Sequence, residues 1–152
     1  MDFLPKKEAF ICGFSFGAIN AFEHALTTKE FFKKLILLSP AFYCQTDDKF
    51  KEQQLAAFKA DEELYKIKLL KKSGLDEESG KKYGVNGSAE QLEKLLYFGW
   101  DKSGFEKLSK MGVKIEVYIG SNDRVVDPNR SVEFFKEHAT VYLLKDKNHF
   151  LA

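Results

Sequence analysis

Apolar and polar positions follow two different periods along the chain. Continuous apolar runs predict four strands, at residues 9–12, 35–38, 113–119 and 140–144. Apolar side chains at helical spacing predict helices at residues 18–26, at residues 105–111 and from Pro128 onward. Strand and helix therefore alternate, and we expect an α/β domain with four parallel strands in sequential order and helices on both faces of the sheet.

The segment from residue 43 to 99 has a different composition, with Lys, Glu and Gln between Leu, Phe and Tyr at helical spacing. It predicts three helices, whose apolar positions are Phe50, Leu55 and Phe58, then Leu64, Ile67 and Leu70, then Leu92, Leu95, Leu96 and Phe98. Residues 77–88, with three glycines, predict a mobile loop. Because this excursion lies between two strands of one sheet, we expect a helical lid; the alternative is helices that only cover the sheet.

Length and charge narrow the class of protein. A chain of 152 residues suits one domain, residues 1–152, that can bury a core. The formal net charge of +1 gives no overall field of the kind that marks a nucleic-acid-binding protein. The hydrophobic fraction of 44%, with 15 Phe, argues against disorder and fits an aromatic core or an acyl-binding cavity.

The two cysteines, Cys12 and Cys44, form no C-x-x-C motif and no Cys/His spacing for a metal, so we expect two buried free thiols and no metal site. No apolar run is long enough for a signal peptide or a membrane span, which takes roughly 18 apolar residues. The sequence therefore predicts a cytoplasmic protein that does not enter a membrane.

The strongest motif is Gly13-Phe14-Ser15-Phe16-Gly17, which joins the first predicted strand to the first predicted helix. This pattern predicts a nucleophile elbow, a tight turn that holds one serine at its apex. Glycines at positions 13 and 17 would let strand and helix approach each other closely. The alternative is a glycine-rich turn with an incidental serine.

A serine nucleophile needs a histidine base and a carboxylate that orients it. Among the three histidines, His24 lies within the first helix and His138 at the end of the last one, whereas His149 follows the last strand in a short loop. The acid is expected in residues 120–127, after the third strand. We favour Asp123 over Asp127, because Asp127 directly precedes Pro128 and is well placed to cap a helix.

The order Ser15, Asp123, His149 is that of α/β-hydrolases. More narrowly, CGFSFGAINA, LILLSPAF, GVKIEVYIGSNDRVVD and the final NHFL resemble the small bacterial pimeloyl-ACP methyl ester esterases of the BioV type. The resemblance implies a serine carboxylesterase of biotin biosynthesis that removes a methyl ester from a pimeloyl group on acyl carrier protein. It assigns Ser15 as nucleophile, Asp123 as acid and His149 as base, and it implies no cofactor.

The chain departs from the usual α/β-hydrolase in one respect. One oxyanion donor is expected to be the N–H of Phe16, but the first half of the fold, which carries the second donor, is missing. That donor would come from residues 1–7 or the lid, or the chain is an N-terminally shortened form. A very slow hydrolase and a non-catalytic acyl-carrier or lipid-binding module therefore stay open, as does a carboxylesterase or thioesterase for another acyl substrate.

The resemblance also implies an acidic partner, acyl carrier protein. Lys68, Lys71 and Lys72 in the expected lid would share a helix face and form a basic rim, while Ile67 and Leu70 point at the core. The alternative is a solvated lysine-rich face. We expect Phe14, next to the serine, to contact the substrate.

Overall fold

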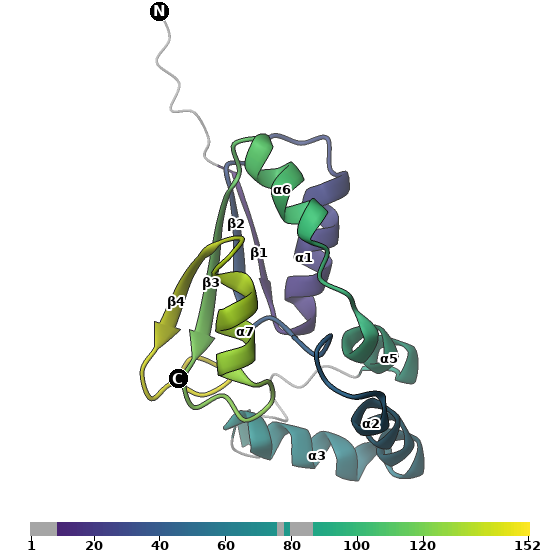
Figure 1. The fold of residues 1–152 in the computed structure, drawn as a ribbon. Coiled ribbons are helices and arrows are strands. Elements are labelled where there is room, and N and C mark those ends of the chain that lie inside the picture. Colours follow the sequence, from purple (N-terminus) through teal and green to yellow (C-terminus); the bar gives the residue numbers. More distant parts are fainter. Residues whose placement is uncertain (1–8, 76–77, 80–86) are drawn as a thin grey trace, which may run out of the picture.

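The computed structural model describes residues 9–75, 78–79 and 87–152. Four parallel strands form one sheet in sequential order: β1 (Phe10–Phe14), β2 (Lys34–Leu38), β3 (Lys114–Gly120) and β4 (Thr140–Leu144). The α/β fold with four sequential parallel strands is confirmed. Because all strands run the same way, their carboxyl ends meet at one edge of the sheet (Figure 1).

Three helices connect the strands and cover one face: α1 (Phe16–Thr27), α6 (Lys102–Lys110) and α7 (Pro128–Phe135). Local sequence sets their ends. Gly112, at φ 79°, follows the end of α6 in the left-handed conformation that favours glycine. Asp127 accepts hydrogen bonds from the first turn of α7, and Pro128 occupies the first helical position.

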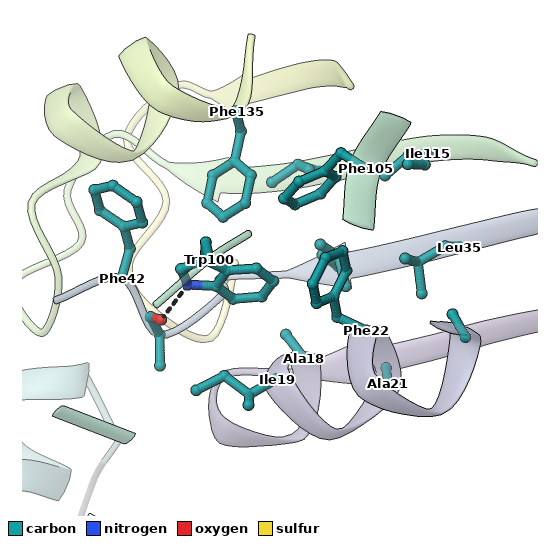
Figure 2. Packing of buried hydrophobic residues seen from close by; sticks show 14 of the residues in the cluster. Ala18, Ile19, Ala21, Phe22, Leu35, Phe42, Trp100, Phe105, Ile115 and Phe135 are labelled. Carbon is teal, nitrogen blue, oxygen red and sulfur yellow. Dashed lines mark hydrogen bonds between the residues drawn. The ribbon is translucent and has the colours of Figure 1, made fainter. Parts of the chain in front are cut away.

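Aromatic side chains join these helices to the sheet. The ring centroids of Phe22 in α1 and Phe105 in α6 lie 4.5 Å apart. Those of Trp100 and Phe135 in α7 lie 5.1 Å apart, with the two rings edge to face. Figure 2 shows these rings gathered against the strands. The buried strand residues beneath them are Leu35, Leu37, Ile115, Val117 and Ile119.

The opposite face of the sheet differs from the prediction of helices on both faces. Residues that are paired across neighbouring strands point to the same face of the sheet. On the face opposite the helices, Phe10 is 64% exposed, Tyr142 is 39% exposed and Cys12 is exposed. No helix within the described residues packs there. The expectation of two buried thiols is therefore wrong for Cys12; Cys44 is half-buried, and both cysteines are free.

Three cap helices lie across the carboxyl ends of the strands (Figure 1): α2 (Asp48–Ala60), α3 (Glu62–Ser73) and α5 (Ala89–Tyr97). Each has a side-chain cap: Asp47 on α2, Asp61 on α3, and a reciprocal pair of Ser88 and Gln91 on α5. Most of the predicted loop at 77–88 lies outside the described residues. None of the described helices is both long and apolar enough to span a bilayer.

Candidate active site

Ser15 sits in the turn between β1 and α1 with φ 52° and ψ −115°. A non-glycine residue at positive φ costs about 1–3 kcal/mol and needs its surroundings to hold it there. The Ser15 N–H donates to Leu38 O at 2.9 Å, and the Ser15 carbonyl accepts from Ala18 N at 3.1 Å. The turn is thus tied to the neighbouring strand and to the helix behind it.

The two glycines of the motif have different roles. A Cβ on Gly13 would lie 2.1 Å from Gly17 O, so strand and helix approach too closely for any side chain there. A Cβ on Gly17 would meet nothing within 4 Å. The close-approach prediction holds for Gly13 and is wrong for Gly17.

The structure brings Ser15, His149 and Asp123 together at the carboxyl edge of the sheet. His149 Nε2 lies 3.0 Å from Ser15 Oγ, and His149 Nδ1 lies 2.6 Å from Asp123 Oδ2. His149 and Asp123 are buried, with residue exposures of 3% and 6%. Through this series of hydrogen bonds the serine can pass its proton to the imidazole, which the carboxylate holds in the right orientation.

Backbone amides fix the carboxylate. Asp123 Oδ1 accepts from Val125 N at 2.8 Å and from Val126 N at 3.1 Å, which leaves Oδ2 for His149. Asp127 instead accepts from the amides of Asn129 and Arg130 at the start of α7. The two carboxylates therefore bond to different partners, as the sequence predicted.

The loop that carries His149 is held against the end of β3. Asn122 N donates to Lys147 O at 2.8 Å, and Asn148 Oδ1 accepts from Phe150 N at 2.9 Å. A Cβ on Gly120, the last residue of β3, would lie 2.3 Å from both Lys147 O and Asn148 O, so the close approach of the loop requires glycine there. The acid loop and the histidine loop thus form one bonded unit.

Ser15 and His149 open into a cavity of about 340 Å³ between the strand ends and the cap helices. This volume falls within the range of small-molecule sites, about 300–1,000 Å³. Its lining is mainly apolar, from Phe14, Phe50, Ala57, Leu69, Leu92, Leu95, Leu96, Val126 and Phe150 among others. An apolar cavity beside a serine suits an alkyl or acyl chain.

Phe14 and Phe16, on either side of Ser15, are also predicted site residues. Phe14 lines the cavity, and its ring lies 5.3 Å from that of His149. Phe16 is the first residue of α1, so its N–H is one of those that a helix leaves without an intrahelical acceptor. The proposed second donor in residues 1–7 lies outside the described residues.

On α3, Lys68 and Lys72 line the cavity, whereas Lys71 is not among the lining residues. Ile67 is 50% exposed, so the expectation that it points at the core is wrong, while Leu70 lines the cavity. Both are on a helix that covers the strand ends rather than a sheet face, and its outer side meets solvent.

Four further polar residues line the cavity and were not predicted from the sequence: Tyr43, Gln54, Tyr65 and Ser73. Tyr65 Oη donates to Gln54 Oε1 at 3.2 Å, and Tyr43 Oη donates to Val125 O at 2.8 Å. No local pattern marks Tyr43, Gln54 and Tyr65, because their partners come from other elements. No cluster of three or more metal-ligating His, Cys, Asp or Glu side chains occurs among the described residues.

A sequential parallel sheet whose first strand turns through a serine into a helix, with an aspartate and a histidine in loops after later strands, defines the α/β-hydrolase fold. No family model and no curated protein matches the chain. Solved structures do match its fold.

A bromoperoxidase from Bacillus anthracis has a TM-score of 0.72 and 17% identity, over 93% of this chain and 60% of that one. An esterase from Exiguobacterium antarcticum has a TM-score of 0.65 and 17% identity, over 91% of this chain and 58% of that one. BioG from Haemophilus influenzae has a TM-score of 0.60 and 12% identity, over 99% of this chain and 72% of that one. The chain thus spans about three fifths of the length of the first two proteins, and the likeness is one of fold.

Proposed function

We propose that the protein is a serine carboxylesterase that hydrolyses the methyl ester of pimeloyl-acyl carrier protein, a step of biotin biosynthesis. The observation that carries the esterase part is the bonded series Ser15, His149 and Asp123 opening into an apolar cavity. The substrate part rests on the sequence resemblance and on a cavity suited to an alkyl chain.

In this mechanism Ser15 Oγ attacks the ester carbonyl while His149 Nε2 takes its proton. The oxyanion accepts a hydrogen bond from the Phe16 N–H, and His149 gives its proton to the departing methoxide oxygen, so that methanol leaves. His149 then takes a proton from a water molecule, whose oxygen attacks the acyl carbonyl. As the bond to Ser15 Oγ breaks, His149 returns that proton to Ser15 Oγ and the carboxylate is released. Asp123 orients the imidazole throughout.

Acyl carrier protein is the proposed partner. Lys68, Lys71 and Lys72 are exposed residues of α3, and none has an ion-pair partner among the residues that the structure describes. By contrast, Lys66 of the same helix pairs with Glu62. Unpaired cations near the cavity suit an acidic carrier protein that delivers its cargo on a long arm.

The test is to incubate the protein with pimeloyl-acyl carrier protein methyl ester and weigh the product. We expect loss of the mass of one methylene group, as the methyl ester becomes a carboxylate. Ser15→Ala should lose turnover and labelling by a fluorophosphonate probe while keeping its fold. If the wild type is labelled but does not hydrolyse this ester, the proposed substrate is wrong and the protein is an esterase for another substrate. If it is neither labelled nor active, the proposed enzymatic activity is refuted.

A further inference from the structure

Tyr43 lines the cavity and lies in the segment that joins β2 to the cap helix α2. The residue is 9% exposed, and its ring stacks at 6.3 Å on that of Phe50 in α2. Its hydroxyl donates to Val125 O at 2.8 Å, across 82 positions of sequence. A buried tyrosine hydroxyl usually finds such a partner, but here the partner belongs to the acid loop.

The bonded peptide continues directly to the carboxylate. The N–H of that same peptide belongs to Val126 and donates to Asp123 Oδ1 at 3.1 Å, next to Val125 N–H at 2.8 Å. Asp123 Oδ2 in turn contacts His149 Nδ1 at 2.6 Å. Tyr43 is thus two hydrogen bonds away from Asp123 and three from His149. The series is largely buried, and in such surroundings each hydrogen bond is stronger than in water.

The segment around Tyr43 is itself anchored. Trp100 Nε1 donates to Ala41 O at 3.0 Å (Figure 2), and Phe42 packs 5.1 Å from Phe134. On the other side, Ala41 N donates to Ser15 O at 3.3 Å. The segment 41–43 therefore contacts the core, the serine turn and the acid loop.

The hydroxyl is available as a donor at any working pH. Burial, followed by the charges of Tyr65 and Asp123, raises the pKa of Tyr43 well above its ordinary value. Its proton therefore stays in place to bond Val125 O.

We propose that Tyr43 is a positioning residue for the reaction: by holding the Val125 peptide, it keeps two amides on Asp123 Oδ1 and so aims Oδ2 at His149. This inference rests on the proposed function. It links the base of the cap to the orientation of the catalytic acid.

The test compares Tyr43→Phe with Tyr118→Phe. Both remove one tyrosine hydroxyl, but Tyr118 Oη donates to Glu116 Oε2 on the open face of the sheet, away from the site. In Tyr43→Phe we expect kcat on an ester to fall about 2- to 10-fold, the worth of one hydrogen bond, with KM little changed. Fluorophosphonate labelling of Ser15 should slow by a similar factor, and Tyr118→Phe should match the wild type.

A second readout does not need turnover. The Nδ1–H proton of His149 should give a downfield NMR signal through its bond to Asp123, and Tyr43→Phe should shift or broaden this signal. An unchanged signal together with wild-type kcat would overturn the proposal, as would a rise in KM alone, which points to a damaged cavity wall. If the wild type hydrolyses no ester, the proposed function fails, but the NMR comparison still decides whether Tyr43 positions Asp123.

Discussion

At the scale of single residues, Asp123 and Asp127 lie four positions apart in the sequence but have different hydrogen-bond partners. Asp123 is buried and bonded to His149, whereas Asp127 is exposed and caps α7. The difference gives a matched pair of substitutions, since both can be changed to the amide of the same shape.

We expect Asp123→Asn to lower turnover by about 10³- to 10⁴-fold, because a neutral amide no longer holds the imidazole in its working tautomer. Asp127→Asn should keep turnover near wild type, since Asn caps a helix about as well as Asp. Ester hydrolysis by the two purified variants is the measurement. If Asp127→Asn causes the larger loss, the acid is assigned wrongly.

Gly120→Ala should displace the His149 loop. The new Cβ would start 2.3 Å from two carbonyl oxygens of that loop, which must then move. A misplacement of about 1 Å in a catalytic group can cost roughly 10²-fold, so we expect a loss of that order in kcat. Gly99→Ala is the control, because a Cβ there meets nothing within 4 Å. Equal activity of the two variants would show that the loop absorbs the change.

At the scale of elements, the open face of the sheet carries a cross-strand ion cluster. Glu116 of β3 lies 3.0 Å from Lys34 Nζ of β2 and 3.5 Å from Lys114 Nζ, and its side chain is only 6% exposed. The hydrogen bond from Lys34, helped by Tyr118 and Lys114, lowers the pKa of Glu116 below its ordinary value. The cluster therefore joins two strands by charge on a face without a helix among the described residues.

Because the folded-state pKa of Glu116 is lowered, its ionised form stabilises the fold above the ordinary pKa of a glutamate, and this contribution is lost as the pH falls below it. We expect Glu116→Gln to reduce the free energy of unfolding by about 0.5–1 kcal/mol at pH 7. The difference from wild type should shrink as the pH falls from about 4.5 toward 3. Urea unfolding at several pH values measures both, and a difference independent of pH would contradict the assignment.

At the scale of the whole molecule, carrier-protein docking should depend on charge. Reversing Lys68, Lys71 and Lys72 to Glu should lower kcat/KM for the carrier-protein ester by about 10-fold at low salt, with a smaller effect on a small soluble ester. The loss should fade with added salt. Reversing Lys102, Lys107 and Lys110 of α6 changes the net charge equally, at a distance from the cap helices (Figure 1). Equal losses from the two triple variants would argue against docking on α3.

Much of the fold and of the candidate site could be predicted because both depend on local sequence. Apolar runs identify the strands, and residues that follow parallel strands must meet at one edge, which brings Ser15, Asp123 and His149 together. The bond between Tyr43 and Val125 leaves no such trace, because its partners are 82 positions apart. The exposure of Cys12 and Ile67 depends on what covers them, which no local pattern states.

The 134 positions between Ser15 and His149 have a consequence for how the protein folds. Local elements such as α1 and α3 need only neighbouring residues to form, but the contact of His149 with Ser15 requires β2, β3 and β4 to have paired in turn. Distant pairings close the largest loops and are generally the slow ones. During refolding, helix content should therefore return before the contact between Ser15 and His149 forms. The rate at which Ser15 regains its reactivity toward a label would then measure the docking of the last strand, and not the formation of most of the secondary structure.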